Sequence, residues 1–152
     1  MDITKIVQEI QYVLSPAVMV SSSALLLLGY QNKFSNLASR FRVLNHEKRV
    51  LSQKDHRDAL EEERLTSLTT QVHNLMLRAT YVKNAIVLTY CAILCFTGTS
   101  ILIFSNIYSP AQLLHFTIAV FLIGLVLVFA SSVLMIMETA LFYKVISLER
   151  KS

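Results

Sequence analysis

The stretch "NAIVLTYCAILCFTGTSILIFSNIYSPAQLLHFTIAVFLIGLVLVFASSVLMIM", residues 84 to 137, decides the fold because it contains no Asp, Glu, Lys or Arg. A second uncharged run extends from Ile10 to Asn32. Apolar, charge-free stretches of about 18 or more residues are typical of transmembrane helices. The chain is 54% hydrophobic and 16% charged, whereas soluble domains carry about 25% charged residues. The sequence therefore predicts an all-α integral membrane protein with one membrane domain.

The longer run exceeds one span, and Ser105–Pro110 is expected to divide it. Ser109 followed by Pro110 is typical of a helix start. The first run is expected to be a retained span rather than a signal peptide, because it is long and no convincing cleavage motif follows it. The predicted segments are an amphipathic lead-in at 1–11, span one at 12–30, a helical hairpin at 31–84, span two at 85–104, a turn at 105–110, span three at 111–137 and a helical tail at 138–152.

The distribution of Lys and Arg predicts the orientation of these segments. Ten of them lie between Gln31 and Lys83, and the turn between spans two and three has none. Cytoplasmic loops carry the excess of Lys and Arg in membrane proteins. We therefore expect a multi-pass protein of the cell (inner) membrane, with the N-terminus and the turn outside and the hairpin and C-terminus in the cytoplasm.

The segment between the first two spans is expected to be helical, because neither Gly nor Pro occurs between Gly29 and Gly98. Asp58 and Glu61 have the spacing of a capping box, which indicates that a second helix starts there. A heptad pattern leads from that point into span two; its members are Leu65, Leu68, Val72, Leu75, Ala79, Val82 and Ile86. The prediction is a long cytoplasmic hairpin of two helices, each continuous with a span.

A basic cluster follows span one. Its cations are candidate contacts for anionic lipid headgroups, and they equally fit topogenic charge on a solvated helix face. They are Lys33, Arg40, Arg42, Lys48 and Arg49. Nucleic acid is not an expected partner, since the positive charge of the chain arises from this asymmetry across the membrane.

Each span carries small or polar residues at a spacing of seven, which places them on nearly the same helix face. Such a stripe allows close helix packing, or it lines a water-filled path in an oligomer. Both interpretations stay open. The candidate residues are Ser15, Ser22 and Gly29 in span one, Cys91 and Gly98 in span two, and Thr117, Gly124, Ser131 and Glu138 in span three.

Glu138 is the most informative charge, because it stands where span three leaves the membrane. Arg78 and Lys83, near the start of span two, are expected at the same depth and are the candidate ion-pair partners. The alternatives are an ordinary interfacial carboxylate or a role in conduction.

The sequence contains no metalloprotease, nucleophile-elbow or phosphate-loop motif, and its three glycines exclude a glycine-rich loop. The histidines and cysteines lack metal-ligand spacing. We expect no enzymatic activity, no cofactor and no metal. Cys91 and Cys95 are interpreted as small residues within a span.

The run "VLSPAVMVSSSALLLLGYQNKFSNLASRFRVLN", Val13–Asn45, carries a resemblance. Asn32, Lys33, Ser35, Leu37, Arg40 and Arg42 form its motif, with Ser39 in place of the usual acid. The chain resembles a small prokaryotic three-span membrane family that is catalogued as a domain of unknown function. That resemblance implies no established activity.

The predicted topology is also similar, more weakly, to proton-motor stators of the ExbB, TolQ and MotA type. Those proteins form pentamers around a pore that their last two spans line. Their conserved proline before the glycine-rich run is missing here, so no residue roles are transferred. The similarity implies that this topology can form a ring.

Three small-residue stripes offer more packing surface than one chain can use, so a homo-oligomer is expected, with five subunits as the working number. The leading functional hypothesis is a channel for small ions, with Thr117, Ser131 and Glu138, or Ser15 and Ser22, facing the path. The alternatives are a non-conducting scaffold or accessory subunit, and a force-coupled stator. Membrane lipids are the other expected partners.

Overall fold

The computed structural model describes residues 3–53, 58–108 and 114–149, and its description of the fold is confined to them. Within these ranges the chain is all helical and has no strand. The three helices are α1 (Ile3–Ser52), α2 (Ala59–Tyr108) and α3 (Leu114–Glu149). An all-helical fold with three long apolar helices is the one that the uncharged runs predict.

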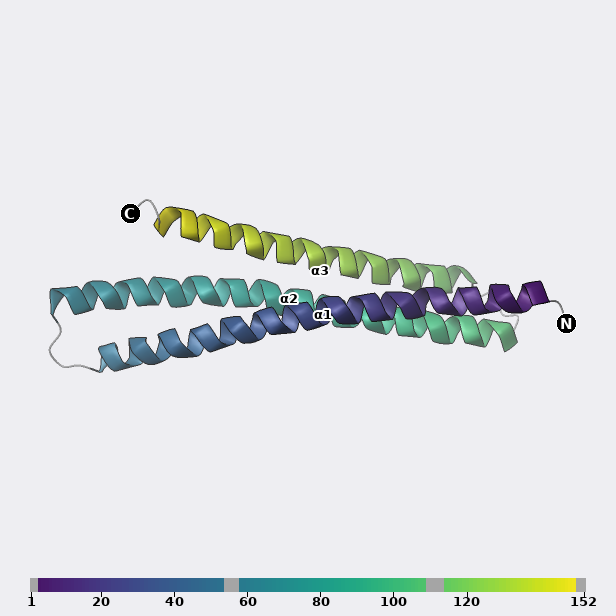
Figure 1. Cartoon of the computed structure of the whole chain (residues 1–152), viewed down its shortest axis with the longest axis horizontal. Helices are drawn as coiled ribbons and strands as arrows, with labels where there is room; N and C mark the ends of the chain where they lie inside the picture. The colour runs from purple at the N-terminus through teal and green to yellow at the C-terminus, as the bar shows by residue number, and fades with distance from the viewer. Residues whose placement is uncertain (1–2, 54–57, 109–113, 150–152) are drawn as a thin grey trace.

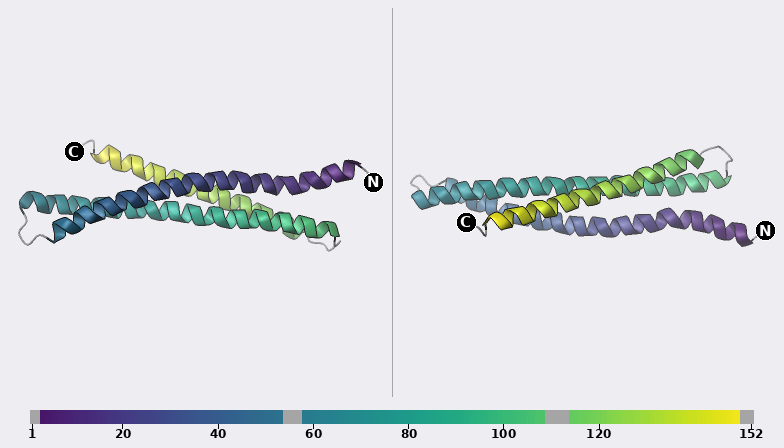
Figure 2. Two further views of the ribbon diagram at one scale, coloured as in Figure 1. Left: turned by 60° about the horizontal axis from the view of Figure 1, so that its bottom comes forward. Right: turned by 90° about the horizontal axis from the view of Figure 1, so that it is seen from above.

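The helices lie roughly along one common axis (Figure 1). α1 and α2 run antiparallel beside each other, and α3 lies along α2 and crosses it obliquely (Figure 2). α2 packs extensively against both other helices, whereas α1 and α3 meet at very few points. The centre of the fold is therefore α2, and any link between α1 and α3 has to come from long side chains.

Each helix has a series of buried residues that repeats every seven positions, and Leu27 of α1 and Ala85, Ala92 and Thr99 of α2 are buried as well. The buried series of α1 contains Pro16, Ser23, Tyr30 and Leu37; that of α2 contains Leu68, Leu75, Val82, Thr89 and Phe96; that of α3 contains Thr117, Gly124, Ser131 and Glu138. A repeat of seven keeps one face of a helix turned toward its neighbour over many turns. This period, rather than a broad apolar face, organises the fold, because the outward faces are equally rich in Leu, Ile, Val and Phe.

An apolar cluster lies where all three helices meet. Leu37 of α1 packs with Leu75 and Val82 of α2, and Met135 of α3 packs against this group. Phe41, Leu44 and Ile86 complete it. Leu75 and Val82 belong to the heptad pattern that the sequence shows ahead of span two, and all seven members of that pattern are buried or half-buried.

The start of α2 agrees with the position predicted from the sequence, whereas its end does not. α2 starts directly after Asp58, whose carbonyl oxygen accepts hydrogen bonds from the backbone N–H groups of Glu61 and Glu62, at 2.9 and 3.1 Å. At its other end, α2 continues to Tyr108, so the part of the expected turn from Ser105 to Tyr108 is helical. The expected helix start at Ser109 and Pro110 lies outside the described residues.

Both α1 and α2 are 50 residues long, which corresponds to about 75 Å at 1.5 Å per residue. α1 continues through Pro16 without interruption. A bilayer core is only about 30 Å thick, so these helices can place at most part of their length within it. Near the joined ends, Arg64 of α2 pairs with Glu47 of α1 through Nε at 2.9 Å and Nη2 at 2.6 Å.

Candidate functional site: a buried carboxylate shared by three helices

The most unusual polar group in the described residues is Glu138, whose side chain is fully buried. Arg78 of α2 donates to its Oε1 from Nε at 2.9 Å, and the Nη2 of Arg78 lies 2.8 Å from the same oxygen. The Arg78 side chain is itself only 15% exposed. Burying a carboxylate costs several kcal/mol unless it is paired and hydrogen-bonded, and Arg78 supplies both kinds of compensation.

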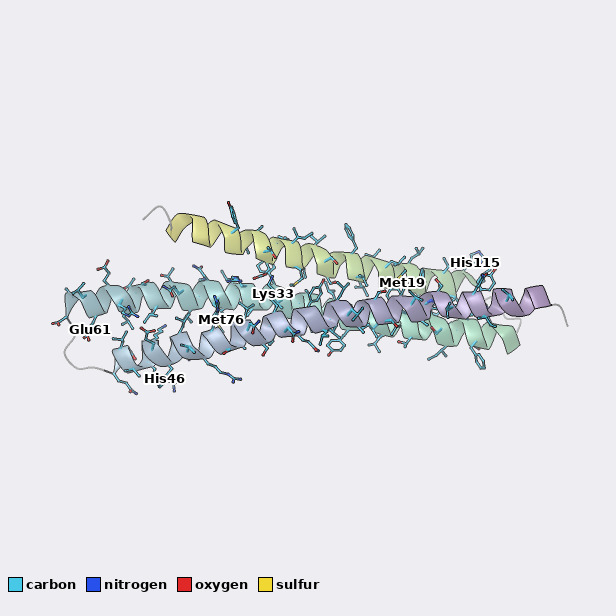
Figure 3. The ribbon with its side chains drawn as sticks, in the orientation of Figure 1. Met19, Lys33, His46, Glu61, Met76 and His115 are labelled. Atoms are coloured by element: carbon cyan, nitrogen blue, oxygen red, sulfur yellow. The ribbon has the colours of Figure 1, made fainter. Side chains whose placement is uncertain are left out.

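Lys33 of α1 supplies the second cation. Its ammonium group forms an ion pair with Oε2 of Glu138 and also donates to Oγ1 of Thr139 at 3.3 Å. Oε2 accepts no hydrogen bond of ordinary geometry from the described residues, so this ion pair is the contact that compensates it. Figure 3 labels Lys33 near the middle of the long axis, between the end with Met19 and His115 and the end with His46 and Glu61.

The three charged residues, which we call the Glu138 cluster (Lys33, Arg78 and Glu138), come one from each helix. Because α1 and α3 meet at few points, the contacts of Lys33 with Glu138 and Thr139 are a principal link between them. Leu37, Leu75 and Met135 of the apolar cluster each lie one helical turn from the charged residue on the same helix. The Glu138 cluster and the apolar cluster therefore hold the three helices together at the same position along the bundle.

This level coincides with the ends of the uncharged runs. Lys33 directly follows the run Ile10–Asn32, and Glu138 directly follows the run 84–137. Arg78 lies six residues before the latter run, or about 9 Å along the helix. Three helices are long and apolar enough to cross a membrane, in the ranges Ile10–Ser52, Ala59–Asn106 and Leu114–Leu141. The Glu138 cluster thus stands at one boundary of the uncharged layer that the helices form together.

The stripe of α3 packs within the chain. Thr117, Gly124, Ser131 and Glu138 are all buried. At Gly124, an added Cβ would lie 2.7 Å from Cε1 of Phe96, so the absence of a side chain allows the aromatic ring of α2 to approach. That ring is fully buried and packs on Phe121, with the ring centroids 5.6 Å apart. Of the two interpretations of a small-residue stripe, the structure assigns helix packing to this one.

Most residues in the stripes of α1 and α2 are exposed, in contrast to the buried stripe of α3. Ser15, Ser22 and Gly29 of α1 and Cys91 of α2 are exposed, and an added Cβ at Gly29 or Gly98 would meet no atom within 4 Å. In α1 the buried series lies one residue further along the chain than the stripe, at Pro16, Ser23 and Tyr30. Gly98 is half-buried, and Ser15 lines a pocket of about 510 Å³ together with Thr99 of α2 and Thr117 of α3.

The remaining candidate residues are spread along α1 and α2, and most of them are exposed. Lys83, the second expected partner of Glu138, is exposed, and no contact with Glu138 is found in the described residues; Lys33 occupies that role instead. Arg40, Arg42 and Arg49 are exposed and Lys48 is half-buried. Among the described residues, no three His, Cys, Asp or Glu side chains lie close enough together to hold a metal ion.

A family model described as "Protein of unknown function (DUF2721)" matches residues 13–148. The chain belongs to the DUF2721 family. The match confirms the resemblance carried by Val13–Asn45, and all three residues of the Glu138 cluster lie inside it. No curated protein and no solved structure matches the chain. The similarity of this DUF2721 protein to proton-motor stators is not shown by these comparisons.

In the sequence, Lys33 is a candidate lipid contact or topogenic charge, and its ion pair with Glu138 was not predicted. The signal was present in part, because Lys33 and Glu138 are the first charges after their uncharged runs and so share a depth. The rotation of α1 about its axis decides whether Lys33 faces α3 or the surroundings. Residue spacing does not specify that rotation.

Proposed function

We propose that the chain is the subunit of a homo-oligomeric membrane protein that conducts small ions. Its placement in a membrane is supported by three helices of sufficient length and apolarity. The excess of Lys and Arg in the segment between the first two spans supports a cytoplasmic position for that segment, with the N-terminus outside. The Glu138 cluster would then lie at the cytoplasmic boundary of the inner membrane.

The observation that carries the conduction proposal is the exposed polar stripe of α1. Ser15 and Ser22 present hydroxyl groups on the outside of a helix segment that has no charge, and Gly29 leaves its face open. Hydroxyl oxygens can replace part of the water shell of a passing ion. Thr117, Ser131 and Glu138 are buried within the chain, so the proposal gives the path to the exposed stripe of α1 rather than to that of α3. The path would therefore be lined by α1 of each subunit.

A second candidate, a non-conducting scaffold, is favoured by a specific observation on the same stripe. Ser22 donates its hydroxyl proton to the carbonyl oxygen of Val18 at 3.0 Å, and Ser21 donates to that of Ala17 at 3.2 Å. Hydroxyl donors that bond within their own helix need no water. Small residues then serve close contact between subunits, as they do within the chain at Gly124.

Ion flux through the protein in liposomes separates these two functions. We expect Ser22→Leu to reduce the flux several-fold, because a large apolar side chain would replace the hydroxyl in the path. Ser21→Leu is the matched control, since Ser21 is also exposed, also bonds to its own helix and lies about 100° away around it. Its flux should stay within twofold of wild type. No flux above empty vesicles from a verified oligomer, under several ions and voltages, would favour the scaffold instead.

The proposed orientation has a separate test. In a chain with Cys91 and Cys95 replaced by Ala, the variants Glu63→Cys and His115→Cys each introduce one thiol at an exposed position. A membrane-impermeant maleimide added to spheroplasts is expected to label the His115→Cys protein at once and the Glu63→Cys protein only after lysis. The reverse pattern would place the N-terminus in the cytoplasm.

A further inference from the structure

Beside the Glu138 cluster lies a pocket of about 450 Å³. Its lining comes mainly from one face of α1, together with Arg78 of α2. The lining residues are Lys33, Asn36, Leu37, Ser39, Arg40 and Arg78. Lys33, Asn36 and Arg40 are spaced by three and four residues, so they follow one another along the same side of the helix. A volume of this size lies within the range of about 300–1,000 Å³ that is typical of small-ligand sites.

The charge around this pocket is strongly positive. Three cations line it, and the carboxylate of Glu138 contacts two of them, Lys33 and Arg78. The sequence offers few further acids, since residues 10–46 and 64–137 contain neither Asp nor Glu. Glu47, the nearest acid along α1, pairs with Arg64. Three positive groups against one negative group leave an excess that an anion can neutralise.

The polar groups of the lining suit one anion in particular. The guanidinium of Arg40 offers N–H donors in the fixed geometry that matches phosphate oxygens. The guanidinium of Arg78, whose Nε and Nη2 contact Glu138, adds positive charge beside it. The ammonium of Lys33, the amide of Asn36 and the hydroxyl of Ser39 add donors around the same hollow. Arg78 is held in place by its bonds to Oε1 of Glu138, so part of the site is already ordered before a ligand arrives.

We propose that this pocket binds a phosphate group, supplied by the headgroup of an anionic phospholipid in the adjoining leaflet. The source follows from position: Lys33 is the first residue after an uncharged run, and Arg40 lies about 10 Å further along the helix. This span covers the whole polar layer of a bilayer, which adds about 5–8 Å on each side of the core. The inference rests on the proposed membrane position and is independent of ion conduction.

The test uses the purified full-length protein in a neutral detergent, with three probes: dioctanoyl phosphatidylglycerol, dioctanoyl phosphatidylcholine and inorganic phosphate. The readout is the probe concentration that gives half of the maximal rise in unfolding temperature. The variant is Arg40→Gln, because Arg40 lines the pocket and has no described contact with Glu138. Arg42→Gln is the matched control, since Arg42 is exposed on the same helix and does not line the pocket.

We expect phosphatidylglycerol to act at a lower concentration than phosphatidylcholine. Arg40→Gln should raise the half-saturating concentration of phosphatidylglycerol about tenfold, the effect of losing one charge-assisted hydrogen bond. Arg42→Gln should change it less than twofold. An Arg40-dependent effect of inorganic phosphate that equals the lipid effect would assign the site to soluble phosphate. Equal losses in both variants, or no preference for the anionic lipid, would overturn the proposal.

Discussion

Replacing Glu138 with Gln is expected to lower the free energy of unfolding by about 3 kcal/mol. The carboxylate is fully buried, and its removal leaves the guanidinium of Arg78 without its partner at a position that is 15% exposed. Lys33 adds less to the loss, because its side chain is 35% exposed and can reach water. Unfolding of the purified protein in mixed micelles of increasing denaturing strength measures the effect.

Glu47→Gln is the matched control for this substitution. Glu47 also pairs with an arginine of α2, Arg64, but both partners are exposed, at 36% and 65%. Exposed ion pairs contribute about 0.2–1 kcal/mol, so the control should lose less than that. Equal effects of the two substitutions would show that the Glu138 cluster is no stronger than a surface ion pair.

Gly124→Ala is expected to have the second largest effect, a loss of about 2 kcal/mol of unfolding free energy. The new Cβ would lie 2.7 Å from Cε1 and 3.0 Å from Cδ1 of Phe96. The ring has little freedom to move away, because it is fully buried and packs on Phe121. Relief of the contact therefore requires α2 and α3 to separate. The same unfolding measurement in mixed micelles reports this loss.

Gly98→Ala provides the comparison, because a Cβ at Gly98 meets no atom within 4 Å. Alanine favours a helix over glycine by about 1 kcal/mol, so this variant should be as stable as wild type or more stable. A loss at Gly98 that equals the loss at Gly124 would mean that both effects come from the helix backbone and not from the contact with Phe96. If Gly98 faces a second subunit, its substitution would weaken the oligomer without changing the fold of the chain.

Much of this fold could be predicted from the sequence, because the number and length of the helices depend only on where charges, Gly and Pro occur along the chain. Two uncharged runs predict where the helices can cross a membrane, and the lack of Gly and Pro between Gly29 and Gly98 predicts helices that continue far beyond those runs. The depth argument for Glu138 led to Arg78, and the structure brings these two side chains together. Each of these inferences needs only a position along the chain.

The parts that could not be predicted depend on how each helix is rotated about its axis. In α1, the series Ser15, Ser22, Gly29 and the series one residue later, starting at Pro16, both repeat every seven residues. The structure buries the second, because Tyr30 and Leu37 extend it into the apolar cluster. The same rotation turns Lys33 toward α3 rather than outward. A pattern of spacing alone cannot rank two faces that share one period.

One carboxylate, that of Glu138, joins all three helices, and double-mutant cycles on unfolding free energy test this link most directly. The cycles pair Glu138→Gln with Lys33→Gln, with Arg78→Gln and, as the control, with Lys83→Gln. Residues in one ion-pair network show coupling energies of about 0.5–3 kcal/mol, whereas independent sites add within about 0.3–0.5 kcal/mol. The structure predicts coupling of at least about 1 kcal/mol for Lys33 and for Arg78 and additivity for Lys83. Additive effects for Lys33 would contradict the link between α1 and α3, and additive effects for both cations would contradict the shared carboxylate.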